Sequence, residues 1–282
     1  MKFLTLNTHS WLEIHQHHKI HILADFIVEQ EIDVIALQEV NQNLTASQVT
    51  AATSFIPASD IPLKSNNFAL LLMEIISQKT GDYTWSWGDS HQGWEIYDEG
   101  LAIISRIPLR AVHNLEISEK RFAYTDVFRR CALACQLEVQ GKTLWVVSAH
   151  MNWWLKQDFY LFEHDFASLD QQIRALAAGA PVLLLGDFNN DAAIESEGYR
   201  QILEAGWHDA FTAAEVKDGE FTVHHKISGW EDSTRNMRID YIFTSTKVAV
   251  QRYTVVFPDN TDQAISDHSG IVVEIDPHEL TR

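Results

Sequence analysis

One stretch near the middle of the chain constrains its fold more than any other. Residues 182–185 (VLLL) form an unbroken apolar run, which is typical of a strand buried on both faces. Residues 187–191 (DFNND) follow almost directly, and Asp187 and Asn189 would point to the same side of an extended chain. Because ligands of α/β proteins bind beyond the carboxyl ends of the strands, we expect a polar site here. An Asx-rich turn after a core strand would have the same composition.

Apolar patterns elsewhere predict helices and strands that alternate at first and then come in hairpins. Spacings of three and four residues predict helices over residues 15–30, 66–81, 159–176 and 199–205. Short apolar or alternating runs predict strands over residues 2–7, 33–37, 83–87, 100–105, 130–139, 143–151, 182–185, 238–243, 248–256 and 270–275, with a loop over 88–99. Long apolar helices and about ten strands favour two packed mixed β-sheets with helices outside, in a single domain over residues 1–282.

The chain is strongly acidic, which limits the partners that it can bind. It has 21 basic and 39 acidic residues and therefore a net charge of −18. Such a field repels the phosphates of nucleic acids and the surface of anionic membranes, so a nucleic-acid partner is disfavoured. A small anionic substrate stays compatible with this charge, because a bound divalent cation inverts the sign of the field locally.

The two cysteines and the N-terminus indicate the cellular compartment of the protein. Cys131 and Cys135 are four residues apart in a strand-like stretch, a separation of about 13 Å. A disulfide needs Cα atoms within about 7 Å, so both thiols are expected to be free. The apolar run at the N-terminus is too short for a signal peptide, and no run reaches the length of a transmembrane span. We therefore expect a cytoplasmic protein without a membrane anchor.

Polar residues recur at or beside the predicted strands. They are Asn7, Gln38, Glu39, His150, Asp187, Asn189, Asp240, Asp267 and His268. Each alone has a structural explanation as a turn residue, a solvated strand end or a satisfied core histidine. Their joint recurrence in one chain indicates a shared catalytic site. The histidines at positions 15, 17, 18 and 21 are instead expected to form a solvated helix face, because no Cys or carboxylate completes a metal site with them.

Seven motifs together carry a resemblance to a known family. LNTHSW, ALQEVN, EGLAIISR, VVSAHMNWW, LLLGDFNND, RIDYIFTS and ISDHSGIVVEI occur in this order between Leu4 and Ile275. In this the chain resembles the endonuclease/exonuclease/phosphatase superfamily, which is also called DNase I-like. The resemblance implies a four-layer α/β sandwich, in which two packed mixed β-sheets are flanked by helices. It also implies a metal-dependent hydrolase of phosphate esters.

The resemblance assigns a metal site and a set of catalytic residues. Glu39 would be the main ligand of Mg²⁺ or Mn²⁺, with Asn7 and Asp267 close by, and oxygen ligands suit both ions. Asp187 would orient or deprotonate the attacking water, and Asn189 would hold that water or a phosphate oxygen. The reaction implied is in-line transfer of the phosphoryl group to water.

Two histidines are assigned to the phosphate by the same resemblance. His150 and His268 would hydrogen-bond its non-bridging oxygens, and the extra charge of the transition state would favour their protonated forms. In this superfamily each histidine leans on a carboxylate, which here is Glu99 for His150 and Asp240 for His268. Such a partner is expected to raise the pKa of the histidine.

The substrate must be chosen by residues outside the catalytic set. Aromatic and basic side chains in candidate loops offer stacking faces for a sugar and a bidentate partner for phosphate. These candidates are Tyr97, Arg129, Arg130, Trp153 and Trp154. LNTHSWLE, WSWGDSHQGWEIYDEG and AHMNWW further resemble a bacterial cytoplasmic branch that includes maltose 6'-phosphate phosphatase, which implies a phosphomonoesterase acting on a sugar phosphate. The alternatives are a phosphodiesterase of the sphingomyelinase or nuclease type and a binding protein on a decayed catalytic fold.

Overall fold

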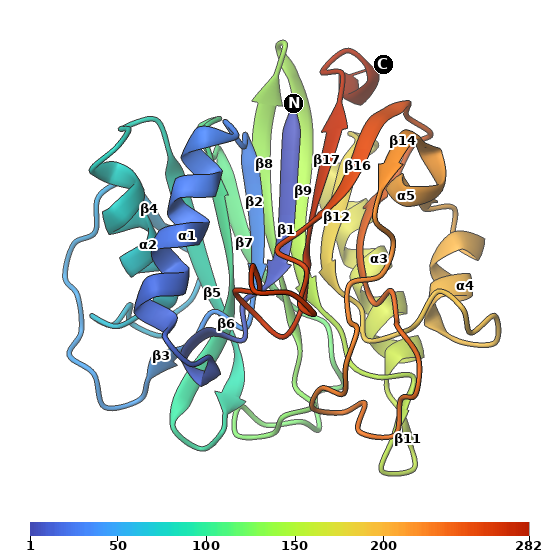
Figure 1. Cartoon of the computed structure of the whole chain (residues 1–282), viewed down its shortest axis with the longest axis horizontal. Helices are drawn as coiled ribbons and strands as arrows, with labels where there is room; N and C mark the ends of the chain where they lie inside the picture. The colour runs from blue at the N-terminus through green and yellow to red at the C-terminus, as the bar shows by residue number, and fades with distance from the viewer. Residues whose placement is uncertain (282) are drawn as a thin grey trace.

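Two large β-sheets form the centre of the molecule, and the computed structural model describes residues 1–281 (Figure 1). The first sheet contains, in spatial order, β14 (Ala214–Asp218), β16 (Val250–Val256), β17 (Gly270–Ile275), β1 (Lys2–Asn7), β2 (Val34–Gln38), β6 (Tyr97–Ser105), β5 (Thr84–Gly93) and β4 (Phe55–Pro57), with β3 (Gln42–Asn43) paired to β6. The second contains β13 (His208–Asp209), β15 (Asp240–Thr244), β12 (Val182–Asp187), β9 (Lys142–His150), β8 (Cys131–Val139) and β7 (Ala111–Glu116). A separate short hairpin consists of β10 (Leu155–Lys156) and β11 (Phe159–Tyr160).

Helices cover the outer face of each sheet, as Figure 1 shows. The first sheet is covered by α1 (Gln16–Glu29) and α2 (Phe68–Ser77), and the second by α3 (Phe162–Ala177) and α4 (Gly198–Glu204). Shorter pieces are α5 (Ala210–Ala213), η1 (Ser10–Leu12) and η2 (Glu279–Thr281). The four-layer α/β sandwich predicted from the sequence is therefore confirmed.

Alternation along the buried strands divides the apolar core into three layers. In β12, Leu183 and Leu185 pack against the first sheet, whereas Val182 and Leu184 pack against α3. Strands β1 and β2 alternate in the same way between the second sheet and the helices α1 and α2. Both faces of these strands are thus buried, which explains why their sequences are continuously apolar.

Strand register brings the polar strand ends into two rows. At the end of β12, Asp187 pairs with His150 of β9 in parallel register and with Asp240 of β15 in antiparallel register. In the first sheet, Asn7 at the end of β1 lies beside Gln38 at the end of β2. Because the two sheets pack face to face, both rows meet at one edge of the sandwich, and this edge carries the site described below.

Several predicted boundaries are wrong. Residues 88–99, which were expected to form a loop, instead extend β5 and β6 into a long hairpin in which His91 pairs with Glu99. The strand pattern continues there through polar residues, which hides it in the sequence. Helix α3 begins at Phe162 rather than at residue 159, because Phe159 belongs to β11. Strand β7 was not predicted, since its side chains are half-buried or exposed without clear alternation.

Gly186 permits the close approach of β12 and β9 beside the site. Its φ is +149°, and a Cβ atom there would overlap the backbone carbonyl of Ala149. We expect Gly186→Ala to lower the free energy of unfolding by about 2–3 kcal/mol, measured by urea denaturation. Gly81→Ala is the matched control, because a Cβ at Gly81 meets nothing within 4 Å, and it should change stability by less than about 0.5 kcal/mol. Equal stability of the two variants would contradict this account of Gly186.

Candidate active site

A cavity of about 230 Å³ lies at the edge where the polar strand ends meet. Most of the site residues predicted from the sequence line it, namely Glu39, Glu99, Arg130, His150, Trp153, Asp187, Asn189, Asp267 and His268. They come from both sheets and from the segments that follow their strands. The structure therefore brings together residues that are far apart in the chain.

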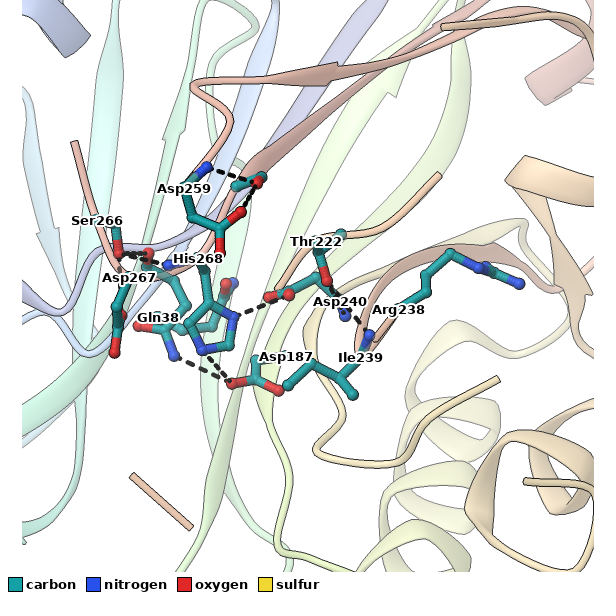
Figure 2. A network of polar contacts seen from close by, with 12 residues as sticks. Gln38, Asp187, Thr222, Arg238, Ile239, Asp240, Asp259, Ser266, Asp267 and His268 are labelled. Carbon is teal, nitrogen blue, oxygen red and sulfur yellow. Dashed lines mark hydrogen bonds and ion pairs between the residues drawn. The ribbon is translucent and has the colours of Figure 1, made fainter. Parts of the chain in front are cut away.

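His268 lies between two carboxylates in this cavity, as Figure 2 shows. Its Nδ1 is 2.9 Å from Asp240 Oδ2, and its Nε2 is 3.8 Å from Asp187 Oδ2. Burial alone would lower the pKa of His268, but the negative charges of Asp240 and Asp187 raise it well above the usual value. The raised pKa favours the protonated form of His268. Burial, together with the charge of Asp240, raises the pKa of Asp187 to about 7.

Asn7 connects the carboxylates of the two sheets. Its Nδ2 group donates hydrogen bonds to Glu39 Oε1 and to Asp187 Oδ2, each over 3.0 Å. Burial raises the pKa of Glu39, and the nearby charge of Asp267 raises it further. Two carboxylates that repel each other in a buried place form a fitting donor set for a divalent cation, and their oxygen ligands suit Mg²⁺ or Mn²⁺.

The acidic side of the cavity contains two further donors that the sequence analysis did not identify. His9, Glu13 and Asp267 each offer a ligand atom, and these atoms lie within 4.8 Å of one another. His9 Nδ1 is 2.7 Å from Glu13 Oε1 and 3.6 Å from Asp267 Oδ1. His9 and Glu13 flank the short turn η1, so their spacing in sequence alone gives no strong metal-binding signal.

His150 has a different environment from His268, and the expected rise in its pKa is wrong. Its Nδ1 is 3.7 Å from Glu99 Oε1, which is too far for a hydrogen bond. Burial lowers the pKa of His150 well below the usual value, and the charge of Arg130 lowers it further. Burial also raises the pKa of Glu99 to about 8, with a further contribution from Glu39. The carboxylate partner is therefore itself inclined to be protonated and does not compensate the imidazolium.

Asn189 completes the row beside His150. Its Nδ2 group lies 3.2 Å from His150 Nε2 and donates to the carbonyl of Met151 over 3.1 Å. Its backbone N–H donates to Asp187 Oδ1 over 2.8 Å. A neutral His150 can accept the amide hydrogen at Nε2, so this contact agrees with its lowered pKa.

Arg130 and Trp153 form the predicted substrate-binding part of the cavity wall. The Arg130 guanidinium is buried, its Nε donates to Asn152 Oδ1 over 3.0 Å, and Asn152 donates to Asp165 Oδ2 over 2.7 Å. Among residues 1–281, Arg130 Nη1 has no hydrogen-bond partner. The guanidinium carbon lies 5.7 Å from the centre of the Trp153 ring.

The other predicted substrate residues lie outside the cavity lining. Arg129 pairs with Asp89 over 3.1 Å and with Glu116 over 3.0 Å, so its charge is already neutralised. Trp154 packs against Tyr160 and Phe162 on the side of α3. Tyr97 begins β6 and pairs there with Asn43 and Gly93.

His91 is a cavity residue that the sequence analysis missed. It is buried on β5 beside a register shift between Asp89 and His91, and its Nε2 is 3.5 Å from Glu99 Oε1. Such a β-bulge re-aims a side chain, which places His91 in the cavity. Its assignment to a loop concealed it, and recognising the hairpin would have placed it opposite Glu99.

Comparison with known proteins identifies the class to which this fold and site belong. The Endonuclease/Exonuclease/phosphatase family matches residues 15–268, and the chain belongs to that family. It is accordingly a phosphohydrolase of the endonuclease/exonuclease/phosphatase superfamily, whose members are metal-dependent phosphoesterases. Among curated proteins, none matches the sequence significantly.

Several solved structures share the fold over nearly the whole chain. An endonuclease/exonuclease/phosphatase family protein from Leptotrichia buccalis is 31% identical, with a TM-score of 0.81 over 98% of this chain and 99% of that one. A mannosyl-6-phosphatase from Bacteroides thetaiotaomicron is 16% identical, with a TM-score of 0.69 over 98% and 99%. TDP2 of D. rerio, complexed with a single-strand DNA product, is 14% identical, with a TM-score of 0.64 over 97% of each chain. The last two likenesses concern the fold alone.

The helices were also compared with the requirements for a membrane span. Within residues 1–281, none combines the length and the apolar character needed to cross a lipid bilayer.

The raised pKa of Glu99 makes stability depend on pH. The folded protein keeps this proton up to a pH of about 8, whereas the carboxyl group of the unfolded chain loses it near 4.5. The free energy of unfolding therefore falls as pH rises through that interval. The slope contributed is at most about 1.4 kcal/mol per pH unit. Glu99→Gln stays neutral throughout, so its free energy of unfolding should decrease less between pH 5.5 and 8.5 than that of the wild type. Urea denaturation in EDTA measures both, and parallel pH profiles would contradict the prediction.

Proposed function

We propose that the chain is a Mg²⁺-dependent phosphomonoesterase of the cytoplasm that releases phosphate from a sugar phosphate such as maltose 6'-phosphate. One observation carries the proposal, which is that a single cavity combines an acidic set with two cationic groups. Glu39 and Asp267 can hold a cation, while His268 and Arg130 can hold an anion. In the described part of the chain, Arg130 Nη1 makes no hydrogen bond and lies 3.8 Å from Glu99 Oε1, so it suits a non-bridging oxygen of a terminal phosphate.

Asp187 is the residue proposed to activate water. With a pKa of about 7, its carboxyl group can accept a proton from water near neutral pH. Asn189 holds that water or a phosphate oxygen, and the His268 imidazolium donates to another phosphate oxygen. Asp240 keeps His268 oriented and charged through the 2.9 Å contact. These groups are preorganised in the protein without substrate, which is the condition for electrostatic stabilisation of a phosphoryl-transfer transition state.

The metal site is proposed at the acidic side of the cavity. Glu39, Asp267 and Asn7 would hold Mg²⁺ or Mn²⁺, with His9 and Glu13 near enough to contribute. When bound, the ion supplies charge neutralisation for the phosphate and acidifies a coordinated water.

Trp153 supports a sugar as the group that carries the phosphate. The charged groups of Arg130 and Lys156 lie 5.7 and 5.0 Å from the centre of its ring, which fixes the indole in the cavity wall. An aromatic face suits the apolar face of a sugar ring. The structure from Bacteroides thetaiotaomicron, which is that of a mannosyl-6-phosphatase, agrees with such a substrate.

A lipid phosphodiesterase of the sphingomyelinase type is the second candidate, and exposed apolar side chains near the cavity favour it. Trp94, which lines the cavity, and Ile96, in the same turn between β5 and β6, are 55% and 48% exposed. The net charge of −18 disfavours both an anionic membrane and a polynucleotide, so a nuclease ranks third. The complete set of catalytic residues disfavours a binding protein on a decayed fold.

The catalytic assignment predicts the effect of two substitutions. Asp187→Ala and His268→Ala should each lower Mg²⁺-dependent phosphate release by at least about 100-fold, because each removes a proton acceptor or a charged donor. Both proteins should stay folded by circular dichroism. His18→Ala, at an exposed position of α1, is the control and should keep full activity. Undiminished activity of either site variant would disprove the assignment.

A substrate screen tests the proposed function as a whole. Phosphate release is measured with Mg²⁺ or Mn²⁺ over sugar monophosphates, nucleotides, sphingomyelin and DNA, with EDTA as the negative control. A sugar phosphate should be hydrolysed with the highest kcat/KM, and Trp153→Ala should weaken its turnover more than that of an aryl phosphate. A preference for sphingomyelin or DNA would refute the phosphomonoesterase, and activity that survives EDTA would refute the metal requirement.

A further inference from the structure

The segment of residues 219–239, called the covering loop here, connects β14 to β15 and reaches the cavity. In Figure 1 it is the orange trace that descends from β14 toward β11. Ile227 and Ser228 of this loop line the cavity. A bridge between Val223 and Met237 closes it on itself, and both side chains belong to a small apolar cluster that Trp230 packs against. The covering loop is therefore an ordered part of the site.

The covering loop is tied to the catalytic strands at its base. Thr222 Oγ1 accepts a hydrogen bond from the backbone N–H of Asp240, and the Thr222 carbonyl accepts one from Ser269. Figure 2 shows Thr222 beside Asp240 and His268. Farther along, His225 Nδ1 lies 2.9 Å from the buried carboxylate of Asp259. These contacts hold the loop in one place relative to the site.

Trp230 carries the contact from which the inference follows. Its indole N–H donates a hydrogen bond to Asn189 Oδ1 over 3.0 Å. The indole group can only donate, so it requires the oxygen of the amide at this place, and the Met151 carbonyl requires the nitrogen at the other end. If the amide oxygen and nitrogen of Asn189 exchanged places, the nitrogen would face the indole N–H, and two donors would meet. The oxygen would face the Met151 carbonyl, and two acceptors would meet.

We infer that Trp230 is a positioning residue, which fixes the orientation of the Asn189 amide so that its nitrogen faces His150 and its oxygen faces Trp230. This inference rests on the proposed phosphohydrolase function and assigns a role to a residue outside the predicted catalytic set. Asn189 has a positive φ of 48°, a backbone conformation that does not by itself determine the amide orientation. The covering loop thus completes the active site with one hydrogen bond.

A double-mutant cycle tests the inference by activity. Trp230→Phe keeps one aromatic ring in the apolar cluster and removes the N–H donor together with the second ring, a loss of volume that the control below shares. It should lower kcat by about 10- to 100-fold and change KM by less than about threefold, because the amide proposed to hold the attacking water is misplaced while Arg130 and His268 still bind the phosphate. In an Asn189→Ala background the same substitution should change kcat by less than about twofold. Losses that multiply would mean that Trp230 acts independently of Asn189, and the inference would be overturned.

Trp207→Phe provides the matched control. It removes an indole N–H that donates to Asp170 Oδ1 over 2.7 Å, away from the cavity. We expect its kcat to match the wild type within about twofold. A loss as large as that of Trp230→Phe would show that any lost indole hydrogen bond lowers activity, and this would also overturn the inference.

A second measurement is independent of activity, so that failure of the inference and failure of the proposed function can be told apart. In ¹H–¹⁵N NMR spectra, the indole signal lost in Trp230→Phe identifies Trp230 Nε1–H. Asn189→Ala should shift this signal and speed its exchange with solvent, while the Trp207 indole signal stays in place. An unshifted Trp230 signal would overturn the inference even if the enzyme is active. A shifted signal in a protein that hydrolyses no phosphate ester would instead refute only the proposed function.

Discussion

The active site depends on one amide that joins two sheets. Asn7 ends a strand of the first sheet, and its Nδ2 group binds Glu39 of that sheet and Asp187 of the second at equal distances. The proposed cation ligand and the proposed water-activating residue are thereby held in a fixed relation. Face-to-face packing of the sheets delivers these side chains to the same edge, and the amide sets their final separation. Strand ends and the short segments directly beside them therefore carry the site residues.

Two histidines that each face a carboxylate have pKa values shifted in opposite directions by their surroundings. His268 contacts Asp240 at 2.9 Å and has a second carboxylate nearby, so its pKa is raised. His150 is 3.7 Å from Glu99, and Arg130 adds a positive charge, so its pKa is lowered. One cavity thus contains a histidine whose raised pKa favours the cation and another whose lowered pKa favours the neutral ring, which can accept a hydrogen bond. Motifs that pair each histidine with a carboxylate do not reveal this difference, because it depends on distance and on a third residue.

Much of the fold and of the cavity lining could be predicted because buried strands keep a continuous apolar pattern and end in polar residues. The run at residues 182–185 and its register with β9 and β15 are of this kind. The outer half of the β5–β6 hairpin, residues 88–99, was expected to be a loop because it is polar on both sides. Trp230, His9 and Glu13 lie outside the regular strands, where no periodicity indicates which side chain turns inward. Arg129 and Arg130 were equivalent in sequence, and only the acidic neighbours Asp89 and Glu116 separate them.

The β5–β6 hairpin separates two kinds of evolutionary change. Its inner part is fixed by register, with His91 opposite Glu99 at the cavity, whereas its turn exposes Trp94 and Ile96 to solvent. Because strand side chains alternate with a period of two, insertion or deletion of residue pairs at the turn leaves Glu99 on the same face. A change in the length of this turn would thus alter the exposed rim beside the cavity and leave His91 and Glu99 in place.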